Sequence, residues 1–429
     1  MISISFNCEQ YQVIRFVQIR QILGVSIWKI AATVLLFLVA YSRGLGQDYP
    51  ASCKPNDWFL LRAQAEAGKV SLLCKGVVDA SLERRSIAER ELNGFIRQHP
   101  DTASVVAAHE ALGNMYYREG RYRKALHQLD MELIEHSAAE DAKEVHSFFS
   151  VLSQYPDLEI ASNLPSEVQA ETVGENLYLP VRANGFLGIY IVDTGANVSA
   201  LCESEARRLG LITHETVSKA LDVSGASIGM RVTETPDLWI GKTHLKHVAF
   251  AVYPDSSEPF VELPKGHKGI LGISVLIALG AFRIDRDNHF EILSNPKSTA
   301  QNLPIVFNGA SAVAQIGLNG KTLSFIFDTG AARSYLYPPI IAAVPDLART
   351  ARRQYQSVTG ASGSTVQEVF IMPSVNLFLG KNVVLSPATV LLRGDTEDSK
   401  WAAGILGFDL ISQTLPITVD FRRMQISTE

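Results

Sequence analysis

Two stretches decide the fold of this chain: IYIVDTGA at residues 189–196 and FIFDTGA at residues 325–331. In each, an apolar run typical of a buried strand ends at an Asp-Thr-Gly triplet that is followed by alanine. One such triplet is weak evidence, because three common residues meet by chance. Two triplets in matched contexts indicate a duplicated half-site. They predict that the carboxyl groups of Asp193 and Asp328 face each other and hold one proton between them.

The repeat extends well beyond the triplets. Asp193 and Asp328 lie 135 residues apart, and later landmarks keep that offset. One stretch slips to an offset of 139, which a four-residue insertion in a surface loop of the second copy explains. The repetition therefore predicts two homologous halves. The matching segments are 223–227 with 358–362, 269–272 with 404–407, 284–285 with 419–420, Gly185 with Gly320, and, at the longer offset, 238–241 with 377–380.

Each copy resembles one subunit of a retropepsin-like aspartic protease. The shared parts are D-T-G-A after an apolar strand, a hairpin with glycine at its tip, and an apolar-apolar-Gly strand near the end, and they span about residues 173 to 429. The resemblance implies an all-β, two-lobed fold in which one chain supplies both halves of a single site. Alanine after each triplet is similar to the viral pattern, whereas pepsin-like enzymes usually have Ser or Thr there.

The resemblance also implies roles for the residues of the two loops. Asp193 and Asp328 are the expected catalytic pair, which activates a water molecule without a metal or cofactor. Thr194 and Thr329 are expected to donate their hydroxyl groups to the opposite loop. Glycine lets each loop turn tightly enough to approach the other. The remaining residues expected to support the pair are Gly195, Ala196, Gly330 and Ala331.

Two further pairs of segments are expected around this pair of loops. Segments 221–230 and 357–365 have turn residues between strand-like flanks, so they predict flap hairpins over the site, with plain surface hairpins as the alternative. Gly272 and Gly407 are expected where a strand passes close behind each loop, since glycine permits close backbone approach. The predicted flap tips are Gly225, Ala226, Gly360 and Ala361.

The two carboxyl groups are expected to be less acidic than a pepsin-like pair. A Ser or Thr after the triplet could hydrogen-bond the aspartate and favour its charged form, but Ala196 and Ala331 cannot. We therefore expect activity at mildly acidic pH. The second copy has Ala332-Arg333 where the first has Asn197-Val198, so the two carboxyl groups need not be equivalent.

Residues 1–46 are predicted to be a signal peptide or a membrane anchor. The apolar run at 30–41 follows Arg15, Arg20 and Lys29, and it is short for a membrane span. We expect the chain to be exported, periplasmic or secreted, and anchored only if this segment is not cleaved. An oxidising compartment would permit a disulfide between Cys53 and Cys74, whereas Cys202 is expected to be a buried small side chain.

Residues 47–156 have no β alternation and predict a helical domain. Gly113, Tyr116, Gly120 and Ala125 fit the tetratricopeptide (TPR) pattern, and a fainter copy lies upstream. Such a domain could hold a partner protein or peptide, or it could pack on the lobes as a structural element. The expected helices are roughly 58–74, 78–98, 102–118, 121–136 and 139–154.

The rest of the chain divides at segments rich in turn residues. Residues 157–172 are the predicted linker to a first lobe at 173–298, and residues 294–304 are the predicted connection to a second lobe at 303–429. The formal net charge of −5 argues against a nucleic-acid-binding protein, which is usually basic. No Cys/His set has zinc spacing, so we expect His244 and His247 to be loop histidines and no metal to be bound.

The sequence thus predicts an aspartic endopeptidase that acts on a protein or peptide substrate. Two alternatives stay open. One is a peptide-binding module that keeps the protease fold without cutting, although an intact Asp-Thr-Gly in both halves argues against it. The other is a scaffold in which the TPR-like region recruits a partner.

Overall fold

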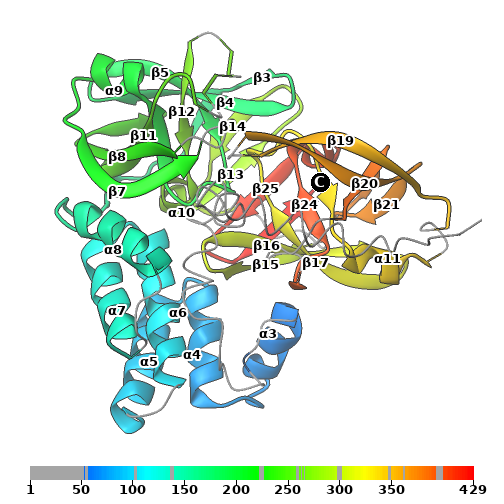
Figure 1. Cartoon of the computed structure of the whole chain (residues 1–429), viewed down its shortest axis with the longest axis horizontal. Coiled ribbons are helices and arrows are strands. Elements are labelled where there is room, and N and C mark those ends of the chain that lie inside the picture. The colour runs from blue at the N-terminus through cyan, green and yellow to red at the C-terminus, as the bar shows by residue number, and fades with distance from the viewer. Residues whose placement is uncertain are drawn as a thin grey trace, which may run out of the picture.

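The computed structural model shows a helical domain followed by two β lobes (Figure 1). The predicted leader at 1–46 and the predicted flap-tip residues Gly225, Ala226 and Ala361 lie outside the described residues. In the part of the chain that the structure describes, no helix has the length and apolar character needed to cross a membrane. The described residues are 53, 57–100, 104–135, 140–221, 227–257, 260–261, 263–264, 266–296, 302–345, 349–360, 363–392 and 400–429.

The predicted helical domain is present, with shorter helices than expected at its start. The expected helix at 58–74 is wrong, because Gly68, with a φ of 68°, follows the end of the first helix, and the Ser71 side chain then caps the next. The expected helix at 78–98 is likewise interrupted at Glu83, which has a φ of 54°. The helices are α3 Trp58–Glu66, α4 Leu72–Ser81, α5 Arg85–Gln98, α6 Ser104–Arg118, α7 Tyr122–Glu135 and α8 Glu140–Leu152.

Small residues let these helices approach each other. A Cβ on Gly76 of α4 would lie 2.6 Å from the Leu92 side chain of α5, so a larger residue would force that side chain to move. Cys53 and Cys74 form a disulfide with a Cα–Cα distance of 5.1 Å, which ties the chain before α3 to α4. The TPR resemblance of this domain stays a prediction.

The first lobe is built on one twisted sheet. Its central order is β4-β5-β12-β6-β11-β8-β7, in which β12 runs parallel to β5 and antiparallel to β6. The strands of the lobe are β3 Glu171–Val173, β4 Asn176–Ala183, β5 Phe186–Val192, β6 Ser199–Cys202, β7 His214–Leu221, β8 Ser227–Thr235, β9 Leu238–Ile240, β10 Thr243–Lys246, β11 Val248–Tyr253 and β12 His267–Leu271. Its helices are α9 Glu203–Arg208 and α10 Ile273–Leu279.

The second lobe repeats this plan, with β24 parallel to β17 and antiparallel to β18. It comprises β15 Asn302–Asn308, β16 Ser311–Leu318, β17 Lys321–Phe327, β18 Tyr335–Leu336, β19 Arg352–Gly360, β20 Gly363–Met372, β21 Val375–Phe378, β22 Asn382–Leu385, β23 Ala388–Leu391, β24 Gly404–Leu406, and the helices α11 Pro339–Ala343 and α13 Phe408–Ile411. The predicted division into two all-β lobes is therefore observed.

The predicted linker at 157–172 is wrong, because most of it is sheet. Strand β1, Glu159–Ser162, pairs with β10, and β2, Ser166–Gln169, pairs with β14. The short, polar β2 gives little apolar alternation, and the sequence pattern therefore resembled a loop. Adding 135 to its residue numbers gives the start of β15, so β2 is the first strand of the repeat.

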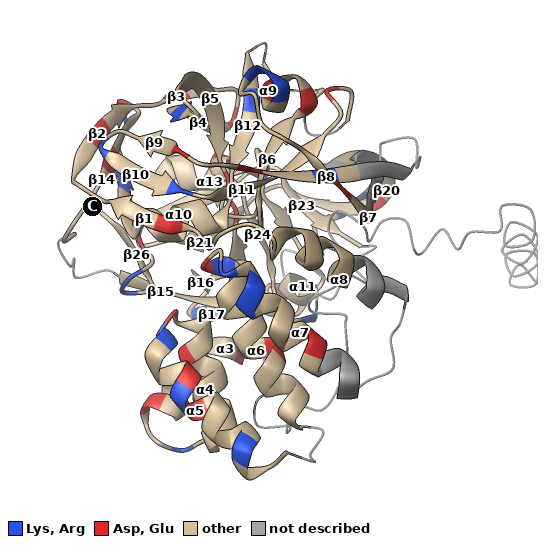
Figure 2. Cartoon of the chain, turned by 90° about the vertical axis from the view of Figure 1, so that its left-hand side faces the viewer, with Lys and Arg blue, Asp and Glu red and all other residues tan. Residues whose placement is uncertain are grey.

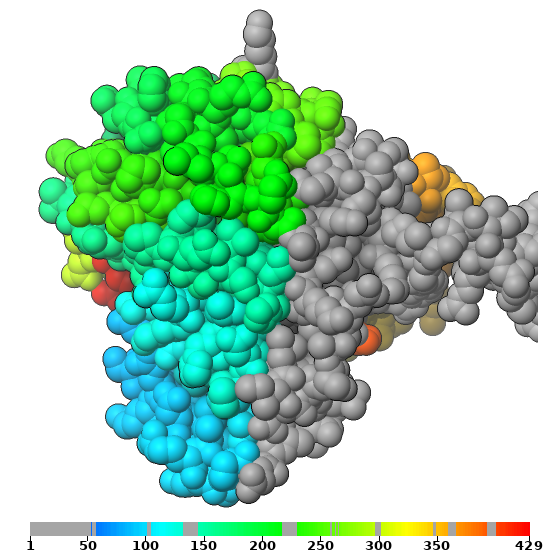
Figure 3. All heavy atoms as spheres, turned by 60° about the vertical axis from the view of Figure 1, so that its left-hand side comes forward, coloured from blue at the N-terminus to red at the C-terminus, as the bar shows by residue number. Residues whose placement is uncertain are grey.

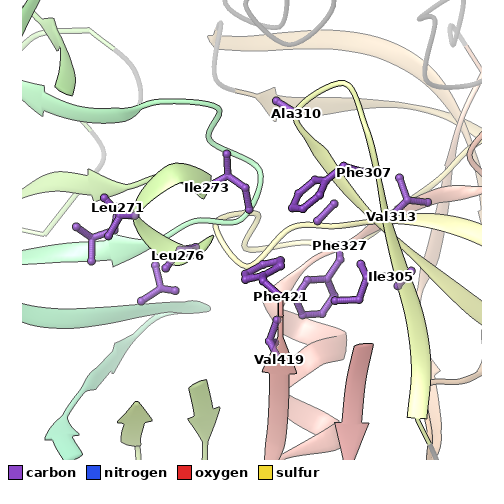
Figure 4. Close-up of a cluster of buried hydrophobic side chains, with 14 of the residues drawn as sticks. Leu271, Ile273, Leu276, Ile305, Phe307, Ala310, Val313, Phe327, Val419 and Phe421 are labelled. Carbon is purple, nitrogen blue, oxygen red and sulfur yellow. The ribbon is translucent and has the colours of Figure 1, made fainter. Parts of the chain in front are cut away.

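A sheet shared by both lobes joins the halves. Its order is β2-β14-β13-β25-β26-β15, and β13 pairs with β25 in antiparallel register across the pseudo-twofold axis. The new strands are β13 Ala281–Ile284, β14 His289–Ile292, β25 Ile417–Asp420 and β26 Gln425–Thr428. Figure 4 shows side chains from both halves, among them Leu276, Phe307 and Phe421, in one apolar layer above it.

The helical domain packs against both lobes. Figure 3 shows it directly beneath the first lobe, and Figure 2 shows acidic and basic residues interspersed along its helices. Helix α8 contacts β7, and α3 and α4 contact β15 of the second lobe. Leu158 N donates to Gly120 O at 3.1 Å, which fixes the chain where it leaves the helices.

Candidate active site

The same strand crossing delivers each aspartate to the interface between the lobes. Asp193 follows β5 directly, and its backbone N donates to Leu271 O of β12 at 3.1 Å. Asp328 follows β17, and its N donates to Leu406 O of β24 at 3.0 Å. Because the neighbouring strand holds the residue after each apolar run, both carboxyl groups emerge at equivalent points of the two lobes.

Glycine behind each loop makes this crossing possible. A Cβ on Gly272 would lie 2.7 Å from Ala196 O, and a Cβ on Gly407 would lie 2.7 Å from Ala331 O. Both contacts are with backbone, which cannot move aside as a flexible side chain would. The structure therefore places Gly272 and Gly407 in the close approach that the sequence predicted for them.

The two threonines of the triplets form a symmetric network of hydrogen bonds across the interface between the lobes. Thr194 N donates to Thr329 Oγ1 and Thr329 N donates to Thr194 Oγ1, each at 3.0 Å. The hydroxyl groups then donate onward, Thr194 Oγ1 to Phe327 O at 2.6 Å and Thr329 Oγ1 to Val192 O at 2.7 Å. Both threonines are almost fully buried, so these bonds lock the loops without competition from water.

Each glycine of the triplets lies against the opposite aspartate. A Cβ on Gly330 would overlap the carboxyl group of Asp193, and a Cβ on Gly195 would overlap that of Asp328. These glycines therefore set how close the two carboxyl groups come. Each carboxyl group therefore lies directly beside the loop that carries the other.

Backbone donors fix the orientation of both carboxyl groups. Gly195 N and Ala196 N donate to Asp193 Oδ1 at 2.8 and 2.9 Å. The equivalent bonds to Asp328 Oδ1, from Gly330 N and Ala331 N, are 3.0 and 2.9 Å long. One oxygen of each carboxyl group, Oδ1, is thereby held in a fixed position.

The surroundings of the two carboxyl groups raise both of their pKa values. Burial raises the pKa of Asp193 well above its usual range, and the charge of Asp328 raises it further. Burial also raises the pKa of Asp328. Two backbone donors oppose the rise at each group, and the two groups titrate as one pair.

Two first-lobe side chains that no sequence motif marked, Asn176 and Glu175, tie the first lobe to the second loop. Asn176 Nδ2 donates to Gly330 O at 2.8 Å, and Arg333 Nε lies 2.8 Å from Glu175 Oε2. At an offset of 135, Glu175 and Arg333 correspond to Ala310 and Val198, so this ion pair has no counterpart in the other half. A comparison of the turns Gly174-Glu175 and Gly309-Ala310 is the signal that could have found it.

The predicted flap segments form antiparallel hairpins. Strand β7 pairs with β8, and β19 pairs with β20 as far as Gly360 and Gly363. Of the predicted tip residues, Gly360 alone lies within the described part of the chain. The second hairpin is regular along its length, whereas the first has a register shift between Glu215 and Lys219.

Several other predicted residues lie outside this site. His244 stacks on Trp239 with a centroid distance of 4.1 Å and contacts Asp237, and His247 follows β10 and contacts Glu234. Cys202 is buried. One cluster, Asp285, Asp287 and His289, brings three possible ligand atoms within 4.8 Å of one another. Asp285 already accepts three local hydrogen bonds there, which stabilise the β13–β14 turn.

Comparison with known proteins agrees with this geometry. The family model described as Aspartyl protease matches the chain twice, at residues 179–275 and 314–410. The matches place one Asp-Thr-Gly loop in each copy and support a duplicated aspartic-protease unit. With the repeated strand crossing, they bear out the predicted two-lobed fold. No curated protein matches the chain.

Three solved structures are similar over part of the chain. A retropepsin-like aspartic protease from Rickettsia conorii is 21% identical, with 32% of this chain and 91% of that chain covered and a TM-score of 0.21. The aspartic proteinase from Irpex lacteus is 11% identical over 62% and 97% of the chains, with a TM-score of 0.38. Basic 7S globulin from soybean is 12% identical over 61% and 94%, with a TM-score of 0.37. At these values the likenesses add no argument to the two family matches.

Proposed function

We propose that this protein is an aspartic endopeptidase in which Asp193 and Asp328 form the catalytic pair. The observation that carries the proposal is the pair of neighbouring carboxyl groups, each fixed by two backbone donors and each lying against the glycine of the opposite triplet. Two acids in such contact cannot both ionise readily, so the pair carries one proton over a wide pH range.

The chemistry follows from that shared proton. A water molecule held between the carboxyl groups gives a proton to ionised Asp328 as its oxygen attacks the peptide carbonyl carbon. Protonated Asp193 gives its proton to the carbonyl oxygen, and a tetrahedral diol forms. When the C–N bond breaks, the nitrogen takes the proton from Asp328, a diol hydroxyl returns its proton to Asp193, and the pair is regenerated.

The decisive experiment is cleavage of a mixed peptide library by the full-length protein from pH 3 to 8. We expect Asp193→Asn and Asp328→Asn each to lower kcat by at least about a thousandfold, because each removes one half of a shared acid–base pair. Asp255→Asn, at a partly exposed carboxylate of the first lobe, is the matched control and should cleave normally. Activity that survives either dyad substitution would contradict the proposal.

The peptide-binding alternative makes a different prediction for the same samples. It expects binding of extended peptides with no cleavage at any pH. The two aspartates, the hydrogen bonds between the threonines and the glycines behind them are all present. This favours catalysis over peptide binding alone, because binding a peptide does not require two buried acids.

We also propose that the helical domain is a structural part of the enzyme and that the chain is exported. Contacts of α8 with the first lobe and of α3 and α4 with the second support the structural role over a free partner-binding groove. The Cys53–Cys74 disulfide supports an oxidising compartment. Recovery of the protein from the cytoplasm with Met1 at its N-terminus would contradict export.

A further inference from the structure

A cavity of about 580 Å³ opens beside the second dyad loop. Its walls come from both lobes: Glu175 lies on the β3–β4 turn of the first lobe, Arg333 follows the Asp328 loop, and Gln356 lies on strand β19 of the second hairpin. Phe408 and Asp409 of α13 also line it. The cavity thus adjoins both the residues that follow the Asp328 loop and strand β19 of the second hairpin.

The equivalent position in the other half is filled by apolar side chains. At an offset of 135, Phe408 becomes Ile273 and Glu175 becomes Ala310. Thr172, another lining residue, becomes Phe307. Figure 4 shows Ile273 of the first lobe opposite Phe307 and Ala310 of the second. Ile273, Phe307 and Ala310 are buried in the main core.

The helical domain covers this filled position from outside. The guanidinium of Arg118, at the end of α6, lies 4.6 Å from the centroid of the Phe307 ring and donates to Gly309 O. Helix α6 also contacts α10, which begins at Ile273. The two flanks of the dyad are therefore unequal, with a cavity on one side and packed side chains under a helix on the other.

The charges in the cavity wall do not cancel. Arg333 and Glu175 neutralise each other at 2.8 Å. Asp409 Oδ1 accepts from Ser334 Oγ at 2.5 Å and from Leu410 N at 2.8 Å, both of which are uncharged donors. In the described wall this leaves one negative charge without a cationic partner. The residue equivalent to Asp409 in the first lobe is Ser274, so the charge belongs to this flank alone.

We propose that this cavity is a one-sided specificity subsite that binds a lysine or arginine side chain of the peptide substrate, with Asp409 as its recognition residue. The polar wall suits the end of a long basic side chain, and the apolar faces of Leu385, Pro387 and Phe408 suit its methylene stem. The inference rests on the proposed peptide hydrolysis for its substrate class, but the cavity itself can be tested without cleavage.

The cleavage test uses matched peptides built on one cleaved sequence, with Lys, Gln or Glu placed in turn at each position on both sides of the cut. We expect kcat/KM to favour Lys over Glu by about tenfold at one position on one side of the cut, as expected for a single partly screened charge. Asp409→Asn should reduce that ratio to about twofold or less, because the amide keeps the shape and the Ser334 bond but loses the charge. Arg333→Gln should raise the ratio, since it leaves Glu175 unpaired.

Two results would overturn the subsite. One is a Lys-to-Glu ratio that Asp409→Asn leaves unchanged, and the other is an equal preference on both sides of the cut. Glu159→Gln, at an exposed carboxylate of β1 that does not line the cavity, is the control and should keep the parent ratio.

Binding of the same peptides to Asp193→Asn protein separates this inference from the proposed function. Fluorescence anisotropy that shows the Lys preference in Kd, with no cleavage by the parent, would retain the subsite and reject the peptidase. Cleavage by the parent protein with no preference for Lys over Glu would support the peptidase and reject the subsite. Absence of both binding and cleavage would overturn both.

Discussion

Residues beside the two aspartates set the pH range in which the pair of carboxyl groups ionises. In this site the inner oxygens accept from backbone N–H groups, and the residue after each triplet is alanine, with no hydroxyl to offer. Burial therefore raises the pKa of both groups against a limited number of donors. The physical basis of the expected mildly acidic activity is this balance between desolvation and hydrogen bonding.

Ala331→Ser should extend activity to lower pH. The acid limb of kcat/KM reports the lower ionisation of the pair, below which both carboxyl groups are protonated and no base remains. A hydroxyl at position 331 that donates to charged Asp328 lowers that pKa, so the limb should move down by about one pH unit. The measurement is the kcat/KM profile from pH 2.5 to 8.

Ala332→Ser is the matched control, because it adds the same hydroxyl one residue farther along the loop. It should leave the acid limb where it is. An acid limb that Ala331→Ser leaves unmoved, or moves upward, would show that the donor balance does not control the pair.

Among the elements, the strand-to-helix corners behind the loops tolerate little change in side-chain size. Gly272→Ala and Gly407→Ala each force a methyl group against backbone about 2.7 Å away. We expect each to lower the free energy of unfolding by about 2–4 kcal/mol and to lower kcat as well, since the dyad loop must shift. Urea unfolding and peptide cleavage on the same samples measure both effects.

Gly94→Ala provides the contrast within the same chain. Gly94 lies inside α5, and a Cβ there would meet no atom within 4 Å. We expect Gly94→Ala to raise the free energy of unfolding by about 0.5–1 kcal/mol, because alanine has the higher helix propensity. Equal effects at Gly94 and Gly272 would mean that the close approach behind the loop has no energetic weight.

The sequence predicted those parts of the molecule that leave a repeated local pattern. Asp193, Thr194 and Gly272 each recur at one offset, and their apolar flanks have the period of buried strands, so the lobes and the loops could be foreseen. Strand β2 could not, because its exposed polar residues carry no such period and it is held by pairing with the distant β14. The Glu175–Arg333 pair was missed because neither residue recurs in the other half and 158 residues separate them in the chain.

At the scale of the whole molecule, one buried arginine joins the helices to the second lobe. The Arg118 side chain is 2% exposed, and its Nε donates to Glu83 Oε1 at 2.6 Å while its other nitrogens donate to Ala80 O and Gly309 O. Burial raises the pKa of Glu83 to about 7, and Arg118 opposes that rise. The folded state therefore takes up a proton at Glu83 at a higher pH than the unfolded chain does.

Arg118→Met should destabilise the protein more at pH 7.5 than at pH 5. Between the usual carboxyl pKa and 7, native Glu83 binds more protons than unfolded Glu83, so its contribution to stability falls as pH rises through that window. Without Arg118 the ionised carboxylate of Glu83 is buried and unpaired. We therefore expect the free energy of unfolding to fall by about 3–5 kcal/mol at pH 7.5 and by less at pH 5. Urea unfolding at both pH values measures the difference.

Arg97→Met, at an exposed arginine of α5, is the control and should change stability little at either pH. If Arg118→Met has the same effect at pH 5 as at pH 7.5, then Glu83 does not titrate in this range. The packing of Arg118 on Phe307 would then account for its whole contribution.

The ion pair between Glu175 and Arg333 has a consequence for how a duplicated site of this kind can diversify. In a symmetric homodimer every substitution appears twice, so a charge introduced on one flank of the site is copied onto the other. Here both halves lie on one chain, and Ala310 and Val198 occupy the copied positions. When both halves lie on one chain, each half can change by itself. The two sides of the site can then carry different side chains and different charges.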